Sequence, residues 1–331
     1  MRLKCPSCSD PSSGREPRWG DVTKVILGVW PLAGITSGAV DPQLARDTIR
    51  AALDAGIDTV DTAFSYGYEG EAELRLGEAI REHRAAHGQS PRIVGKVGQR
   101  WTADRRRYTD VSPEQLTRDA EESLRRLGVP RFDWLLLHAI DPRVDLRRSA
   151  EALDALRRRG LAAQIGISNA GPEELQTFAS CVPCAALQCP LNLLQRESLE
   201  PLIATATRLG MGSFVYWVLM KGLLTGKIAR DHRFEAGDSR PTYPIFQGTA
   251  RQRAHDVIDG LQQVASSYNT TASHLAIGWA ISQPGVIGAL VGAKSPGQIR
   301  ETAQAKPLTA EVLKAIDGIV VAATTSDPNS A

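Results

Sequence analysis

Eight short apolar runs, separated by longer amphipathic segments, restrict the fold of this sequence more than any other feature. Each run is short and nearly all apolar, which is typical of strands covered on both faces. The helix-like segments between them predict parallel strands joined by right-handed crossovers. Eight such strands can close on themselves, so we expect a (β/α)8 barrel, also called a TIM barrel. The runs cover residues 25–30, 57–61, 92–97, 132–138, 162–168, 184–188, 212–217 and 285–293.

Proline and glycine mark the ends of the predicted helices. Pro42, Pro113 and Pro172 stand in the first turn of three helices, where the N–H that proline lacks would have no partner. Gly56 and Gly128 follow the last turns of two of them, where glycine readily adopts a positive φ. The pattern therefore predicts helices that begin and end close to these residues.

A doubly wound open sheet is the alternative fold. Such sheets usually carry a Gly-x-Gly-x-x-Gly loop after the first strand, whereas this chain reads VWPLAGITSG there. Residues 221–255 form the longest irregular stretch, after the seventh strand, and a loop of that length is usually functional. We predict one catalytic barrel domain over residues 21–320, with the active site at its C-terminal rim and disordered tails over 1–20 and 321–331.

Charge and hydropathy argue against nucleic-acid and membrane partners. The formal net charge is +2, and the arginine clusters at 105–107, 125–126 and 157–159 lie beside acidic residues, as on solvated helix faces. No apolar run reaches the length of about 18 residues that a membrane span needs. The first twenty residues are polar and do not resemble a secretory signal, so the sequence favours a cytoplasmic protein. It leaves the oligomeric state open.

The five cysteines include two Cys-x-x-Cys pairs. Cys5, Cys8, Cys181 and Cys184 could in principle supply four thiolates to a structural zinc ion. The pairs are far apart in the sequence, however, and the odd count disfavours a disulfide framework. We expect reduced thiols and no bound metal.

Polar side chains end three consecutive strands of the predicted barrel. Asp61, Lys96 and His138 close the second, third and fourth runs, and Tyr66 follows five residues after Asp61. Neighbouring strands lie about 4.8 Å apart, and catalytic groups of barrels gather at the C-terminal rim. Each residue alone has an ordinary structural explanation, such as a helix cap or a hydrogen bond to a carbonyl. Their joint placement favours a catalytic cluster.

These four residue types suit the reduction of a carbonyl group by hydride. The carbonyl oxygen needs a proton donor, and a phenol with a pKa of about 10 needs an adjacent cation to become acidic. Lys96 would be that cation, Asp61 would hold Lys96 in place, and His138 would donate to the developing oxyanion. We therefore predict Tyr66 as the general acid. Nothing in the cluster calls for a metal ion.

A serine hydrolase is a rival interpretation. Residues 166–170 read GISNA, which resembles the Gly-x-Ser-x-Gly nucleophile elbow with Ser168 as nucleophile. An elbow of this kind also needs an acidic residue and a histidine later in the chain. His232, His255 and His274 follow Ser168, but none of them ends a strand-like run, which argues against this interpretation.

The chain resembles the aldo-keto reductases over residues 21–320, most of its length. GIDTVDTAFSYGYEGEAELRLGEAI is similar to the family's Gly-x4-Asp-Thr-Ala-x-x-Tyr-Gly signature and its following helix, and GKVG, LLLHAID and GISN match the next strands. The resemblance implies hydride transfer between NADP(H) and a small aldehyde, ketone, sugar or alcohol. Some relatives of this fold are regulatory subunits with little turnover, which is a second alternative. The tetrad implied is Asp61, Tyr66, Lys96 and His138.

The resemblance also implies how the cofactor is held. Ser168, Asn169 and Gln188 would hydrogen-bond the nicotinamide carboxamide, and Tyr216 would stack on its ring. Lys294, beside a hydroxyl group and a helix start, would bind the 2′-phosphate. The further implied cofactor residues are Trp30, Asp61, Leu219, Gly222, Gly292, Ala293, Ser295, Gln298, Glu301 and Thr302.

Three departures from the family pattern bear on cofactor and substrate. Trp217-Val218-Leu219 replaces Ser-Pro-Leu, Thr302 replaces the usual Asn, and Gln298 stands where some members have Arg, so NAD(H) is possible beside NADP(H). Trp30, Trp101 and Trp217 lie in predicted rim loops and would form aromatic walls for an apolar or flat substrate. The physiological substrate and the direction of the reaction are not encoded in these patterns.

Overall fold

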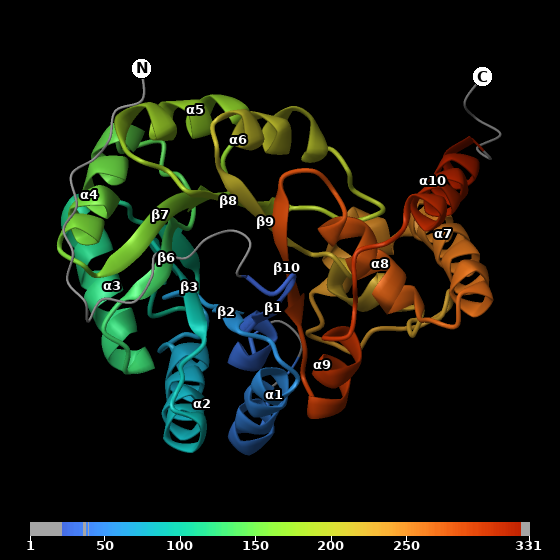
Figure 1. The fold of residues 1–331 in the computed structure, drawn as a ribbon, viewed down its shortest axis with the longest axis horizontal. Helices are drawn as coiled ribbons and strands as arrows, with labels where there is room; N and C mark the ends of the chain where they lie inside the picture. Colours follow the sequence, from blue (N-terminus) through green and yellow to red (C-terminus); the bar gives the residue numbers. More distant parts are fainter. Residues whose placement is uncertain (1–21, 36–37, 39, 326–331) are drawn as a thin grey trace.

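Eight parallel strands close into a barrel in the computed structural model, which describes residues 22–35, 38 and 40–325 (Figure 1). Their order around the barrel is β1-β10-β9-β8-β7-β6-β3-β2. The predicted barrel is thereby confirmed, and an open doubly wound sheet is excluded. The strands are β1 Val25–Gly28, β2 Thr59–Asp61, β3 Arg92–Val97, β6 Phe132–Leu137, β7 Ala162–Ser168, β8 Ala186–Pro190, β9 Gly212–Tyr216 and β10 Val286–Gly292.

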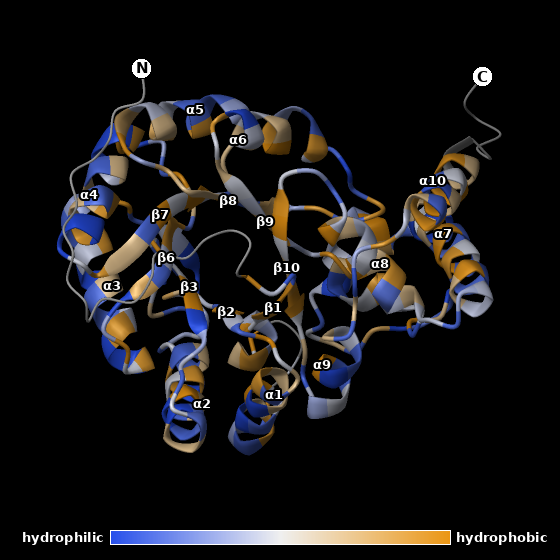
Figure 2. Cartoon of the chain, viewed as in Figure 1, coloured by the Kyte–Doolittle hydropathy of each residue, from blue (hydrophilic) through white to orange (hydrophobic). Residues whose placement is uncertain are grey.

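Helices surround the barrel, and their residues alternate between hydrophobic and hydrophilic along successive turns (Figure 2). Such alternation lets one face of a helix pack on the strands while the other faces solvent. In addition, α10 packs against α7 on the outside (Figure 1). The helices are α1 Pro42–Asp54, α2 Glu71–His87, α3 Pro113–Leu127, α4 Leu146–Arg158, α5 Pro172–Cys181, α6 Ala204–Arg208, α7 Gly248–Ser267, α8 Ala272–Ile281, α9 Pro296–Thr302 and α10 Ala310–Thr325.

The predicted helix boundaries are confirmed by the backbone. Helices α1, α3 and α5 begin at the three expected prolines, and Gly128 caps α3 with a φ of 66°. Gly56 follows α1 with a φ of 87°. Asp41 accepts a hydrogen bond from the backbone N–H of Leu44, which satisfies one of the free donors of the first turn.

Apolar side chains pack inside the barrel. The indole of Trp134 and the ring of Phe214 meet edge to face at a centroid distance of 5.5 Å. A second and larger apolar layer lies between the strands and the helices. Because side chains fill the lumen, ligands must bind at its ends. The interior cluster consists of Val22, Ile26, Val94, Trp134, Leu136, Ala186, Phe214, Ile287 and Leu290.

The segment after β9 is shorter than predicted. It contains the 3-10 turns Met220–Thr225, Arg240–Thr242 and Pro244–Phe246, and α7 then begins at Gly248, so residues 248–255 are helical. Ala254, Val257, Ile258 and Leu261 form the buried face of α7 at helical spacing. Two further features were not predicted: an antiparallel hairpin of β4 Gln99–Trp101 and β5 Arg107–Thr109, and a continuation of α10 to Thr325, past the predicted domain end. Residues 1–21 and 326–331 lie outside the described residues.

No helix in the described part of the chain combines the length and the apolar character that crossing a bilayer requires.

A buried carboxyl group on α2 makes a testable contribution to stability. Glu73 is fully buried and pairs with Arg126 of α3 at 3.2 Å (Oε2 to Nη1), and burial raises its pKa to about 7. The folded protein therefore keeps this proton up to about pH 7, whereas the unfolded chain releases it near pH 4.5. Between these values the folded state binds more protons, so the free energy of unfolding falls as pH rises.

Glu73→Gln is expected to remove this fall. Between pH 5 and pH 7.5 the variant should gain up to about 3 kcal/mol in unfolding free energy relative to the wild type, measured by urea unfolding at both values. Glu82→Gln, which removes an exposed ion pair with Arg50, is the matched control. Its unfolding free energy should change with pH in the same way as that of the wild type. If the unfolding free energy of Glu73→Gln also changed with pH as that of the wild type does, the Glu73 carboxyl would not have a raised pKa.

Candidate active site

The predicted catalytic side chains meet at the C-terminal rim of the barrel. Asp61 ends β2, Lys96 lies next to the last residue of β3, and His138 directly follows β6. In the ladder β2 pairs with β3 and β3 pairs with β6, so the three residues lie on adjacent strands. Tyr66 lies in the loop after β2.

A buried ion pair forms the base of the cluster. Nζ of Lys96 lies 2.6 Å from each carboxylate oxygen of Asp61 and 2.8 Å from the carbonyl oxygen of Thr62. All three ammonium hydrogens therefore have acceptors. Burial raises the pKa of Asp61 and lowers that of Lys96, and the attraction between the two groups opposes both shifts. Each side chain is only 1% exposed, so the pair is held apart from solvent.

Gln188 of β8 is a further partner of this pair. Its side-chain nitrogen donates to Oδ2 of Asp61 at 2.8 Å. The family resemblance assigned Gln188 only to the cofactor amide, so sequence reasoning missed its contact with the carboxylate. No local signal could have found it, because β2 and β8 lie far apart in the chain.

Tyr66 lies against the ion pair and the histidine. Its ring centroid is 4.8 Å from Nζ of Lys96, 5.8 Å from the ring centroid of His138 and 4.9 Å from that of Trp30. Burial, followed by the Asp61 carboxylate, raises the pKa of Tyr66 well above its usual value. The prediction that Lys96 makes this phenol acidic is therefore wrong. The ammonium is already neutralised by Asp61, and burial dominates.

His138 is neutral at physiological pH. Burial first, then the positive charges of Lys96 and Arg107, lower its pKa well below the usual value. Its Nδ1 atom is buried and has no hydrogen-bond partner among the described residues. A neutral imidazole retains one N–H donor. It can therefore donate to an oxygen atom placed beside Tyr66 without carrying a charge itself.

Four of the predicted cofactor residues come together at the ends of β7, β8 and β9. Asn169, with a φ of 56°, donates from Nδ2 to the carbonyl oxygen of His138 at 2.7 Å and to Oγ of Ser168 at 3.1 Å. Its Oδ1 accepts from the hydroxyl group of Tyr216 at 2.7 Å. Together with Gln188 these residues form a polar floor beside the Tyr66 cluster. Among the described residues no imidazole hydrogen-bonds to Ser168, so the triad of a serine hydrolase is not formed.

The turn after β9 carries unusual backbone strain. Trp217, Met220 and Lys221 have φ values of 60°, 41° and 53°, and Gly222 has 92°. Left-handed conformations of non-glycine residues cost energy and cluster at ligand sites. The segment that contains the predicted cofactor residues Leu219 and Gly222 is therefore held in an uncommon conformation at the rim.

The segment from β10 to α9 places the remaining predicted cofactor residues. Gln298 accepts from the backbone N–H of Lys294 at 2.8 Å, and Ser295 caps α9 by accepting from the N–H of Gln298. Glu301 pairs with Lys227 at 2.8 Å. Thr302 is buried, and its hydroxyl group donates to the carbonyl oxygen of Gln298, so it is turned away from the surface. Gly292 is exposed, and Ala293 is buried.

The segment before α7 brings charges to this end of the site that sequence analysis did not single out. Arg240 donates to Asp238, and both lie close enough to Lys294 to affect its pKa, which burial and Arg240 lower. The segment has no periodic pattern, so nothing in the sequence predicted its position.

The three tryptophans predicted to line the substrate site lie just after β1, at the end of β4 and just after β9. Trp101 donates from Nε1 to the carbonyl oxygen of Ser65 at 2.8 Å, and Trp30 lies edge to face against Tyr66. Trp217 meets Tyr243 at a ring-centroid distance of 5.8 Å. The half-buried indoles of Trp30 and Trp101 therefore lie next to Tyr66 and Ser65, whereas Trp217 packs against Tyr243.

The cysteines and possible metal ligands lie elsewhere. Cys181 and Cys184 are free thiols, and burial raises the pKa of Cys184 to about 12; Cys5 and Cys8 lie outside the described residues. Asp54, His83 and His87 bring one ligand atom each to within 4.8 Å of one another. Their positions in the last turns of α1 and α2 put them at the barrel end opposite the rim. Sequence analysis did not single out this group.

Comparison with known proteins agrees with this geometry. The family model described as Aldo/keto reductase family matches residues 24–321. Aldo-keto reductase YhdN from Bacillus subtilis is 32% identical over 282 residues, which cover 84% of this chain and 83% of that protein. The NADH-specific methylglyoxal reductase of Escherichia coli is 28% identical over 86% of this chain and 90% of its own length.

A solved structure extends the agreement to three dimensions. The glycerol dehydrogenase AKR11B4 from Gluconobacter oxydans superposes with a TM-score of 0.84 at 30% identity, covering 94% of this chain and 95% of that one. Family match, relatives and fold all coincide with a rim that carries aspartate, tyrosine, lysine and histidine on the expected strands. The chain therefore belongs to the aldo/keto reductase family of oxidoreductases.

Proposed function

We propose that this protein transfers hydride between NADP(H) and the carbonyl or alcohol group of a small substrate, with Tyr66 as the general acid. The observation that carries the proposal is the position of the Tyr66 ring. Its centroid lies 4.8 Å from Nζ of Lys96 and 5.8 Å from the ring centroid of His138. The activities for which two relatives are named, methylglyoxal reduction and glycerol dehydrogenation, support a small carbonyl or alcohol as substrate.

The donor set beside the cluster fits a nicotinamide cofactor. Ser168, Asn169 and Gln188 offer hydroxyl and amide groups that match a carboxamide, and Tyr216 offers a ring. Lys294 and Arg240 bring positive charge to the other end of the proposed cofactor site, where a phosphate group would require it. When bound, the cofactor supplies or accepts the hydride.

The residues of the chain would then handle the proton. Tyr66, whose raised pKa keeps it protonated at neutral pH, donates its proton to the carbonyl oxygen as that oxygen gains negative charge. Neutral His138 donates a hydrogen bond to the same oxygen and stabilises the transition state. The buried pair of Asp61 and Lys96 fixes the position of the phenol ring.

The direct test is NADPH consumption with phenylglyoxal or 4-nitrobenzaldehyde, beside a fluorescence titration of NADPH and NADH. Turnover with either aldehyde is the expected result. Tight binding of NADPH without turnover on a broad carbonyl panel would contradict the proposal and would instead indicate a cofactor-binding regulatory subunit.

Lys294 is expected to set the cofactor preference. A lysine that binds the 2′-phosphate contributes a charge-assisted hydrogen bond, so Lys294→Met should lower the ratio of NADPH to NADH affinity by about 10- to 100-fold. Dissociation constants from fluorescence titration measure this ratio. Lys314→Met, at an exposed position of α10, is the control and should leave the ratio unchanged. An unchanged ratio for Lys294→Met would place the phosphate elsewhere.

A further inference from the structure

The β4–β5 hairpin carries an arginine at the mouth of the site. Cζ of Arg107 lies 4.8 Å from the ring centroid of Trp30 and 4.7 Å from that of Trp101. The residue as a whole is exposed, yet its guanidinium is sheltered by the two indoles, and burial lowers its pKa. Neither the tetrad nor the predicted cofactor residues account for this group.

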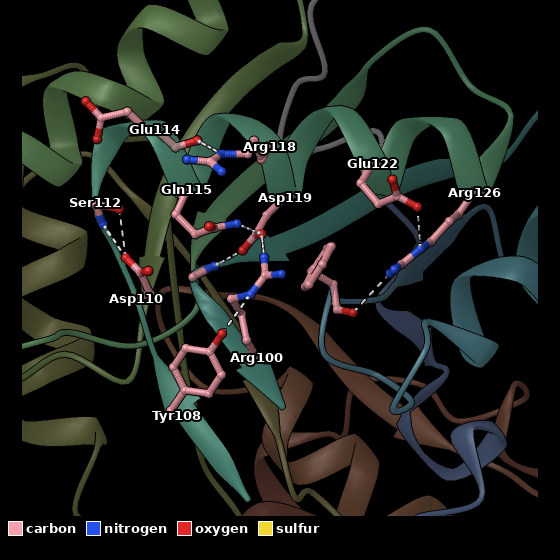
Figure 3. Close-up of polar contacts among 12 residues, drawn as sticks. Arg100, Tyr108, Asp110, Ser112, Glu114, Gln115, Arg118, Asp119, Glu122 and Arg126 are labelled. Carbon is pink, nitrogen blue, oxygen red and sulfur yellow. Dashed lines mark hydrogen bonds and ion pairs between the residues drawn. The ribbon is translucent and has the colours of Figure 1, made fainter. Parts of the chain in front are cut away.

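The hairpin is anchored so that Arg107 faces the rim. Arg100 of β4 forms an ion pair with the buried Asp119 of α3 and donates from Nε to the hydroxyl group of Tyr108 at 3.2 Å (Figure 3). Successive side chains of a strand point to opposite faces. Trp101 and Arg107, which are paired across the hairpin, therefore share the face away from α3.

That face is directed toward the reacting groups. Trp30 links Arg107 to Tyr66, because its ring lies next to both the guanidinium and the phenol. The positive charge of Arg107 acts on Tyr66 and His138: it opposes the rise in the pKa of Tyr66 and contributes to the fall in the pKa of His138. Arg107 also interacts electrostatically with Tyr243, which lies against Trp217 on another wall.

Unlike Arg100 and Arg106, Arg107 has no anionic partner among the described residues. Arg100 pairs with Asp119, and Arg106 pairs with Asp104 at 2.6 Å. Among residues 22–35, 38 and 40–325, no carboxylate forms an ion pair with Arg107 and no hydrogen bond of its side chain is present. A sheltered guanidinium is normally matched by an oxyanion, which its planar fork can bind through two hydrogen bonds.

We propose that Arg107 binds an oxyanion of the substrate, a carboxylate or a phosphate group, while the carbonyl of that substrate lies beside Tyr66. The proposal rests on the proposed function and narrows it to anionic carbonyl compounds. Trp30 and Trp101 flank the guanidinium, with Cζ of Arg107 at 4.8 and 4.7 Å from the two ring centroids. Stacking of Arg107 on the indoles without any role in recognition is the competing explanation.

Paired substrates separate the two explanations. The 3- and 4-carboxybenzaldehydes place a carboxylate at two distances from the reacting carbonyl, and their methyl esters are neutral counterparts of the same shape. We expect the wild type to prefer the acid over its ester by about tenfold or more in kcat/KM for at least one isomer. Arg107→Met should reduce that ratio to about one, and Arg107→Lys, which keeps the charge but not the fork, should leave an intermediate ratio.

Arg106→Met is the matched control on the same hairpin and should keep the ratio of the wild type. Two results would overturn the proposal: turnover of both classes with no preference for either acid, or a preference that survives in Arg107→Met. An increase in the Kd of NADPH for Arg107→Met that accounts for the whole loss would also overturn it, since the guanidinium would then serve the cofactor. Absence of turnover with these four aldehydes and also with phenylglyoxal and 4-nitrobenzaldehyde, together with NADPH binding, would refute the proposed function itself.

Discussion

Tyr66→Phe is expected to lower kcat for NADPH-dependent carbonyl reduction by about 100- to 10,000-fold, the usual contribution of a positioned general acid. The substitution removes one oxygen atom and leaves the ring that packs against Trp30, Lys96 and His138. The fold and the Kd of NADPH should therefore change little. Steady-state kinetics with phenylglyoxal, beside a fluorescence titration of NADPH, measure both quantities.

A second tyrosine provides the control for this experiment. Tyr268 is exposed and lies outside the rim, where its hydroxyl group donates a hydrogen bond to Oε1 of Glu311 at 3.0 Å. Tyr268→Phe should keep the kcat of the wild type. If Tyr66→Phe retained more than about a tenth of kcat, another group would have to supply the proton, and the assignment of Tyr66 as general acid would fail.

Lys96→Met is expected to lower the free energy of unfolding by about 3 to 5 kcal/mol at neutral pH and to abolish turnover. The variant leaves the Asp61 carboxylate buried without its counterion, with only the neutral side chains of Gln188 and Tyr66 beside it. A buried charge without its counterion is costly, whereas removal of both charges is much less so. Asp61→Asn in the same chain should therefore recover part of the lost stability.

Urea unfolding of the two single variants and the double variant gives the coupling energy of the pair. The deficit of Lys96→Met should shrink as the pH is lowered, because Asp61 can then take up a proton. Lys314→Met should change stability by no more than about 0.5 kcal/mol. A loss below about 1 kcal/mol for Lys96→Met would mean that the pair is not held in its buried form.

The strands and their end residues could be predicted because burial on both faces leaves a strong signal in the sequence. All eight predicted runs became strands of the barrel, and the side chains that end three of them are the ones that meet. The acidity of Tyr66 could not be predicted. Its pKa depends on how deeply the loop after β2 is buried and on the neutralisation of Lys96 by Asp61, both of which are three-dimensional properties.

Arg107 shows the other limit of sequence reasoning. Within the run of three arginines at 105–107 the local composition indicates a solvated surface. Only the register of the hairpin separates Arg106, which pairs with Asp104, from Arg107, which lies between two indoles. Pairing across a short hairpin depends on a turn that the sequence did not reveal.

The hydrogen bond from Gln188 to Asp61 connects strands on opposite sides of the barrel, since β8 and β2 are four positions apart in either direction around the closed sheet. The contact ties the Asp61–Lys96 pair to the far wall of the barrel, next to the strand ends that carry Ser168 and Tyr216. Because the closed ladder of strands sets the width of the barrel, loops at the rim can be exchanged while the buried charges beneath them stay in place.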